Sequence, residues 1–144
     1  YNWDEHRDHF ILADCPDHDV DFGEGKKSIF ALEGTEILIQ RDKEVQMAAH
    51  EYGKGRGVYV SGLPYSAANA RLLERALFWA SHNEGKYAAY SSSNPECEVA
   101  VFDKSGCYCV VNNTDRAQST YVERGDGRIE RIELAPSGIA WRTI

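Results

Sequence analysis

The first regular pattern along the chain is an alternation with a period of two. Apolar or β-branched side chains occupy every second position of residues 35–40 and again of residues 45–50, and a third apolar stretch covers residues 58–61. This period predicts β-strands, because successive side chains of a strand point to opposite faces. The glycine-rich residues 53–57 precede the third stretch, and glycine adopts positive φ at low cost. We therefore expect a hairpin turn there.

A helical period replaces the alternation after residue 66. Ser66 is a suitable N-cap, because its hydroxyl can accept a hydrogen bond from a free N–H of the first turn. Gly85 is a reasonable stop signal after the helix. The sequence predicts a helix over residues 67–82.

The spacing of apolar residues predicts which side of this helix is buried. Four apolar residues follow the spacing i, i+3, i+4 and i+7, which places them on one helical face; they are Leu73, Ala76, Leu77 and Ala80. Charged residues fall on the opposite side and are expected to face solvent: Arg71, Glu74 and Arg75. The apolar face requires a cover from another element.

Short apolar runs separated by turns fill the last third of the chain. Residues 91–95 are rich in Ser, Asn and Pro and indicate a linker or long turn. Five strands are expected after it, at residues 98–102, 107–111, 119–123, 128–134 and 139–143. Short strands with Gly, Asn and Asp turns predict an antiparallel sandwich. A unit of about 50 residues is small for independent stability, so we expect it to depend on the preceding domain.

The first 28 residues have no clear period. They are polar and acidic apart from the apolar run 10–13, which could form a brief strand or a turn of helix. We expect a surface arm, or the tail of a domain whose beginning is absent.

Composition limits the classes of function. The 144 residues suit one domain or two small ones, and 42% hydrophobic and 27% charged residues are typical of a globular protein. The net charge of −7 argues against a nucleic-acid partner, because an acidic chain repels phosphate backbones. No stretch reaches the roughly 20 apolar residues that span a bilayer. Four cysteines are too few for a disulfide scaffold and indicate a reducing compartment.

Two groups of residues could in principle bind a metal. His6, His9 and His18 lie near Asp14 and Asp17, but no zinc or calcium loop pattern is present, so a solvated loop is favoured. Cys97, Cys107 and Cys109 lack the spacing of a structural zinc site, and we interpret them as small buried residues.

Three short motifs invite other chemistry. Residues 53–57 contain two cations but lack the G-x-x-x-x-G-K-[ST] pattern of a phosphate loop, so a hairpin is favoured. Ser61 and Ser66 with His50 could form a nucleophilic triad, yet no G-x-S-x-G elbow surrounds either serine. Residues 112–114 match the N-glycosylation pattern and are interpreted first as a turn. None of these motifs identifies a site.

Aromatic residues of the expected strands have two interpretations. Phe102, Tyr108, Tyr121 and Trp141 could form a platform for a sugar, or pack in the core of the sandwich. We favour the core, because aromatic side chains in short strands usually pack there.

Three stretches carry a resemblance to a known family. They are residues 29–38, residues 44–66 with their continuation to 80, and the ending 134–141. Together they resemble the C-terminal region of the 1,3-β-galactosyl-N-acetylhexosamine phosphorylases, also called lacto-N-biose or galacto-N-biose phosphorylases. The resemblance implies that residues 1–86 are the last part of an α/β, glutamine-amidotransferase-like domain, and that residues 87–144 are a C-terminal β-sandwich domain.

The resemblance also implies where the chemistry takes place. In the family an N-terminal (β/α)8 barrel binds galactoside and phosphate, and this barrel is outside the chain. We therefore assign no catalytic, cofactor-binding or metal-binding residue here, and expect no cofactor.

The expected function is a structural and assembly region of a cytoplasmic, inverting phosphorylase. Its expected partners are the N-terminal domains of the parent chain and a second copy in a homodimer, with no nucleic acid and no membrane. The alternatives are a carbohydrate-binding β module, which requires exposed aromatic rings, and a regulatory domain with a metal on the histidine-rich arm.

Overall fold

The computed structural model describes residues 4–15, 20–25 and 28–144. The chain divides into two compact units, residues 1–84 and residues 85–144. No helix in the described ranges has the length and apolar character needed to cross a bilayer.

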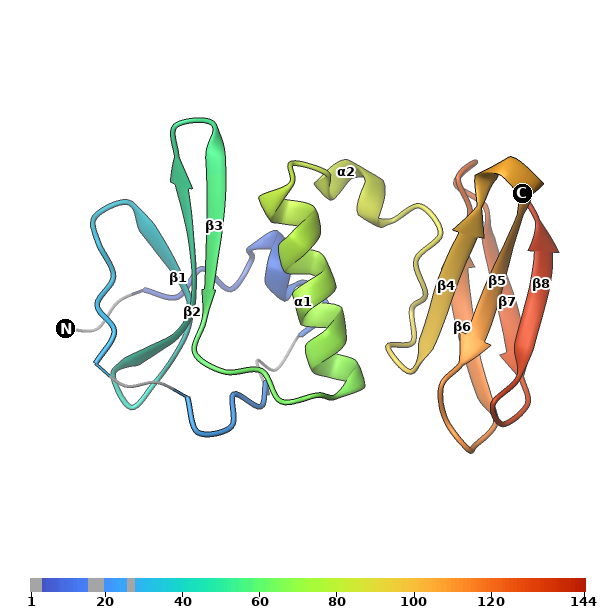
Figure 1. The fold of residues 1–144 in the computed structure, drawn as a ribbon, viewed down its shortest axis with the longest axis horizontal. Coiled ribbons are helices and arrows are strands. Elements are labelled where there is room, and N and C mark those ends of the chain that lie inside the picture. The colour runs from blue at the N-terminus through green and yellow to red at the C-terminus, as the bar shows by residue number, and fades with distance from the viewer. Residues whose placement is uncertain (1–3, 16–19, 26–27) are drawn as a thin grey trace. The chain divides into compact units, whose positions relative to one another are not determined.

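An antiparallel sheet of three strands forms the centre of the first unit. The strands β1 (Thr35–Arg41), β2 (Glu44–Tyr52) and β3 (Gly55–Val60) lie in the order β1-β2-β3 (Figure 1). Their positions confirm the strands predicted from the alternation. The hairpin between β2 and β3 is also confirmed, with Gly53 in its turn at a φ of 59°, a conformation that glycine adopts without strain.

The main helix α1 covers Ala67–Ala80. The Ser66 hydroxyl accepts a hydrogen bond from the Asn69 N–H at 3.0 Å, which confirms the predicted N-cap. The predicted stop at Gly85 is wrong: the helix is followed by Ser81, and Gly85 belongs to the short helix α2 (Glu84–Tyr87). His82 takes the positive φ after the helix end instead, at 59°.

The buried face of α1 includes Ala76 of the predicted face, and Ala80 is partly buried, but the face is centred elsewhere on the helix. Leu72 is 1% exposed and Trp79 is 6% exposed, whereas Leu73 and Leu77 are 46% and 62% exposed. Arg75, expected in solvent, is buried. The prediction chose a face rotated by about one residue, or about 100°, because both faces contain apolar residues and only the packing partners distinguish them.

The expected surface arm is partly core. Phe10–Leu12 form a single 3-10 turn, η1, and Ile11 and Leu12 are buried against α1 and the sheet. Val20 and Phe22 join the same core. The segment therefore belongs to the first unit, since its few apolar residues are the ones that α1 needs as a cover.

The second unit consists of two antiparallel sheets (Figure 1). One contains β4 (Cys97–Phe102), β5 (Cys107–Asn112) and β8 (Ile139–Thr143); the other contains β6 (Gln118–Glu123) and β7 (Ile129–Leu134); the 3-10 turn η2 (Asp103–Ser105) joins β4 to β5. All five predicted strands are confirmed. Side chains from both sheets share one core, as in a sandwich; they are Cys97, Tyr108, Val110, Val122, Ile132 and Leu134.

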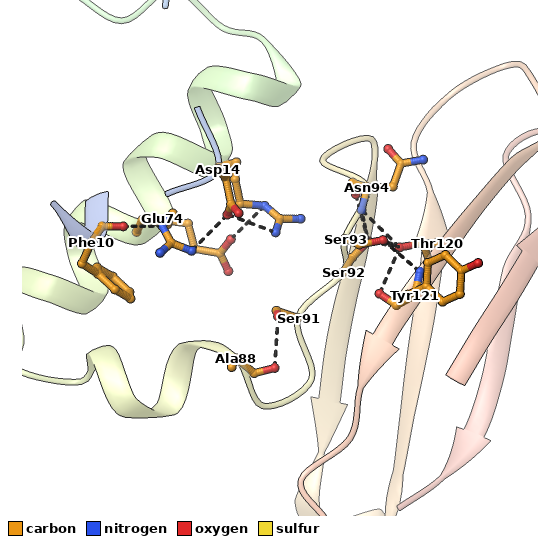
Figure 2. Close-up of polar contacts among 12 residues, drawn as sticks. Phe10, Asp14, Glu74, Ala88, Ser91, Ser92, Ser93, Asn94, Thr120 and Tyr121 are labelled. Carbon is orange, nitrogen blue, oxygen red and sulfur yellow. Dashed lines mark hydrogen bonds and ion pairs between the residues drawn. The ribbon is translucent and has the colours of Figure 1, made fainter. Parts of the chain in front are cut away.

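The linker expected at residues 91–95 is held to this core. Ser92 is buried, and its hydroxyl lies 2.6 Å from the Thr120 hydroxyl on β6 (Figure 2). The Asn94 N–H also donates to the Thr120 hydroxyl at 3.2 Å. Residues 91–95 are therefore the turn, and not the linker, of the two structures expected for them.

Candidate functional site

A polar hollow lies where η1, β1, β2 and α1 meet. Its volume is about 360 Å³, and its lining includes His9, Glu36, His50, Glu51 and Trp79. No spacing in the sequence connects these residues, because they come from four separate segments that only the fold brings together.

His9 is the most constrained group of this hollow. Its Nδ1 accepts a hydrogen bond from the Ile11 N–H at 3.2 Å, its Nε2 lies 3.4 Å from a Glu36 carboxylate oxygen, and its ring meets Trp79 edge-on at 5.1 Å. Burial lowers the pKa of His9, although Glu36 opposes this shift. The neutral ring with its proton on Nε2 satisfies both contacts, so His9 caps η1 rather than acting as a free base.

Arg56 of the glycine-rich hairpin contacts two residues that line the hollow, Glu51 and Trp79. Its guanidinium lies 4.7 Å from the centre of the Trp79 ring, donates to Glu51 at 2.7 Å and to the Trp79 carbonyl at 2.9 Å, and pairs with Glu84. Burial alone would lower the pKa of Arg56, but the hydrogen bonds to Glu84 and Glu51 outweigh it and raise the pKa. This cation is engaged in the fold and is not available to cradle a phosphate.

A second arginine, Arg75 on the buried face of α1, is also engaged in structural contacts. Arg75 donates to the Phe10 carbonyl at 2.7 Å and to Asp14 at 3.1 Å, and its guanidinium stacks 4.2 Å from the Phe10 ring. Figure 2 shows the Phe10 carbonyl and the Asp14 carboxylate of this network; the Glu74 carboxylate pairs with Arg71 at 3.8 Å. Asp14 therefore binds an arginine of α1 and is not placed beside His9 as a metal ligand.

The residues considered for metal binding or nucleophilic catalysis are dispersed. His18 and Asp17 lie outside the described residues, and within the described part of the chain no three His, Cys, Asp or Glu side chains gather as metal ligands. Ser66 caps α1, and the Ser61 hydroxyl donates to Gln46 at 2.7 Å. His50 pairs with the Thr35 hydroxyl at 3.2 Å. No triad is assembled from these residues.

The cysteines behave largely as small buried residues. Cys97 is fully buried in the core, and burial raises the pKa of its thiol. Cys109 is buried and Cys107 is half-buried on the opposite face of the sheet. A thiol with a raised pKa is a poor nucleophile at neutral pH, which agrees with the structural interpretation.

The Asn-Asn-Thr motif is turn chemistry, as expected. Asn112 is 1% exposed, and its amide donates to the Arg116 and Ala135 carbonyls at 2.6 and 2.9 Å. Its side-chain oxygen accepts from the Thr114 N–H at 2.9 Å. The amide is therefore fully used in joining the ends of β5, β6 and β7.

The core assignment of the aromatic residues is right for only one of four. Tyr108 is fully buried and donates to Glu130 at 2.8 Å; burial, followed by this hydrogen bond, raises the pKa of Tyr108 to about 12. Phe102, Tyr121 and Trp141 are exposed, and the rings of Phe102 and Trp141 lie 5.5 Å apart on the outer face of the β4-β5-β8 sheet. In strands, alternation alone does not say which face is covered.

Comparison with known families identifies the class. Residues 1–85 match the family model described as "Lacto-N-biose phosphorylase central domain", and residues 90–142 match "Lacto-N-biose phosphorylase C-terminal domain". The chain belongs to the lacto-N-biose phosphorylase family, which confirms the resemblance seen in the sequence.

Individual relatives agree with this assignment. The chain is 60% identical over 124 residues to 1,3-beta-galactosyl-N-acetylhexosamine phosphorylase of Bifidobacterium longum, covering 85% of the chain and 16% of that protein. It is 51% identical over all 144 residues to 1,3-beta-galactosyl-N-acetylhexosamine phosphorylase Cphy0577 of Lachnoclostridium phytofermentans, 20% of that protein. D-galactosyl-beta-1->4-L-rhamnose phosphorylase of the same organism is 26% identical, covering 78% of the chain and 16% of that protein. The chain thus spans a fifth or less of the length of these relatives.

Proposed function

We propose that this chain is a non-catalytic structural and assembly region of a galactoside phosphorylase. One observation carries the proposal: in the described residues, the polar side chains that could serve catalysis are engaged in structural contacts. Arg56 and Arg75 bind carboxylates and carbonyls, and Asn112 joins three strands. On this proposal, the first unit is the end of an amidotransferase-like α/β domain and the second a C-terminal β domain, and the chemistry lies in a barrel outside this region.

The proposed parent reaction takes its substrate class from the relatives' names and its course from the chemistry of phosphorolysis. Phosphate attacks the anomeric carbon of β-1,3-linked galactose, the bond to the N-acetylhexosamine oxygen breaks, and a carboxylic acid of the barrel protonates that oxygen. The products are galactose 1-phosphate and N-acetylhexosamine, with inversion. We extend the proposal to a homodimeric, cytoplasmic protein of glycosyltransferase type that uses neither nucleic acid nor a membrane as a partner.

The test compares this chain with a full-length enzyme that contains it. A chimera is made from the Lachnoclostridium phosphorylase Cphy0577 by replacing its matched region with these 144 residues, and galactose 1-phosphate formation from lacto-N-biose and phosphate is measured. We expect activity in the chimera and none in the 144-residue chain alone. Activity in the isolated chain would refute a non-catalytic role.

A second candidate, a carbohydrate-binding β module, is favoured by one observation. Trp141 is 57% exposed and Phe102 is 44% exposed, and their rings lie close together, as aromatic sugar platforms require. Isothermal titration calorimetry of the isolated chain with lacto-N-biose distinguishes the two functions. A purely structural region gives no heat, whereas a module gives saturable binding that the substitution Trp141→Ala abolishes.

A further inference from the structure

An open apolar groove of about 670 Å³ lies in the first unit. Its lining includes the segment Ile29–Leu32, residues Val45 and Ala48 of β2, and residues Gly57 and Tyr59 of β3. It shares Ala49 and His50 with the polar hollow around His9, but its lining is chiefly aliphatic and aromatic.

Three strongly exposed large hydrophobic side chains gather along this groove. Phe30 is 86% exposed, Leu32 is 80% exposed and Tyr52 is 85% exposed, and all three line the groove. Soluble proteins rarely leave large apolar side chains gathered in solvent unless the surface binds a partner.

The sheet beneath the groove is apolar on both faces. On one face Leu38 and Met47 pack against Leu72 of α1 in the main core. On the other, Ile37, Val45 and Ala48 form a separate small cluster with Ala31 and Tyr59. Figure 1 shows α1 on one side of the sheet and the segment that leads into β1 on the other. A sheet with two apolar faces is stable when each is covered by another layer, most often of helices.

The floor of the groove has room for such a layer. Ala31, Ala48 and Gly57 contribute little side-chain volume, and a Cβ added to Gly57 would meet no atom within 4 Å. Tyr59 also contributes a buried hydroxyl oxygen that has no hydrogen-bond partner within the described part of the chain.

We propose that this groove receives an amphipathic helix from the polypeptide that lies outside the matched region in full-length phosphorylases. The inference rests on the proposed function. Two findings select this occupant: the first unit matches a domain described as central, and the matched region is only 20% of the Lachnoclostridium relative, so four-fifths of that polypeptide is available to cover it. The helix would place its apolar face between Phe30, Leu32 and Tyr52.

Photocrosslinking identifies the occupant directly. Benzoylphenylalanine is incorporated in place of Phe30 in the Cphy0577 chimera, and crosslinked peptides are identified by mass spectrometry after irradiation. The matched control carries the same residue in place of Tyr65, an aromatic side chain of the same unit that is 93% exposed and does not line the groove. We expect position 30 to crosslink within the chain to a helical segment outside the matched region, and position 65 to give only background.

Two outcomes would overturn the proposal. Crosslinks from position 30 to a second copy would assign the groove to a dimer interface, and a yield equal to that of position 65 would show that nothing covers it. As a second measurement, the variant Phe30→Cys is labelled with a maleimide, with wild-type labelling subtracted. The expected rate in the chimera is about tenfold or more below that in the isolated chain, because thiol reactivity depends on access.

The assay for galactose 1-phosphate separates failure of this inference from failure of the proposed function. An active chimera without crosslinks at position 30 would refute the covered groove while leaving the proposed function intact. A crosslinked but inactive chimera would support the covered groove and count against the proposed function.

Discussion

Substitution of two adjacent leucines of α1 tests the packing of the first unit. Leu72 is 1% exposed and lies in the core with Met47 and Trp79, whereas Leu73 is 46% exposed on the neighbouring side of the same helix. Leu72→Ala and Leu73→Ala remove the same atoms and alter helix propensity equally. The difference between the two variants therefore reports burial alone.

The magnitudes follow from the exposure of each side chain. Removing a fully buried leucine leaves a cavity and costs about 2–5 kcal/mol. Full burial of a leucine contributes about 1.5–3 kcal/mol, so a half-exposed one contributes about 1 kcal/mol. We expect Leu72→Ala to lower the free energy of unfolding by at least about 1 kcal/mol more than Leu73→Ala.

Urea unfolding of the 144-residue chain, followed by circular dichroism at 222 nm, measures this difference. The signal reports mainly on the first unit, because α1 is the long helix of the described chain. Midpoints and slopes are compared at two protein concentrations, so that association through exposed apolar surfaces is detected. Equal destabilisation by the two substitutions, or a larger effect of Leu73→Ala, would refute the assigned buried face.

Three further predictions concern single side chains. The pKa of His9 is lowered in the folded chain, so the unfolded chain binds a proton more readily. The stability that depends on His9 is therefore fully present above about pH 6.5 and falls as the pH drops below that value. His9→Asn, which keeps a capping oxygen, should flatten the pH dependence of the urea midpoint. The pKa of about 12 for Tyr108 means that stability is lost as the pH rises from about 10 toward 12. Tyr108→Phe should cost about 1 kcal/mol at neutral pH by removing the hydrogen bond to Glu130, and should remove a tyrosine that titrates near pH 12 from the absorbance at 295 nm. Asn112→Ala should destabilise the second unit by about 2–4 kcal/mol, because the buried carbonyls of Arg116 and Ala135 lose their donor. Asn113→Ala, at the exposed neighbouring position, should cost less than about 0.5 kcal/mol. Thermal unfolding of both variants measures the difference in stability.

Structural use of the candidate polar residues explains why the described part of the chain offers no evident chemistry. The arginine of the glycine-rich hairpin binds two glutamates, and the serine before α1 caps the helix. These roles could not be distinguished from catalytic ones in the sequence, since the same residue types serve both. Contacts across the fold decide between them.

The sequence alone predicted the elements that depend on local patterns. The strands of both units follow from alternation and glycine or asparagine turns, because the period of two is a property of the extended backbone itself. The N-cap at Ser66 is equally local, since the hydroxyl bonds an N–H three residues away. The family was also visible in the sequence, because residues 44–66 are a continuous stretch.

Only the tertiary structure decided which sides of these elements are covered. Leu72 rather than Leu73 is buried, Arg75 is inside, Trp141 is outside, and Ser92 of the expected linker is bound to Thr120. The physical reason is the same in each case. Burial and hydrogen bonding depend on residues far away in the chain, such as Phe10 for Arg75, and a local period specifies a face without specifying what lies against it.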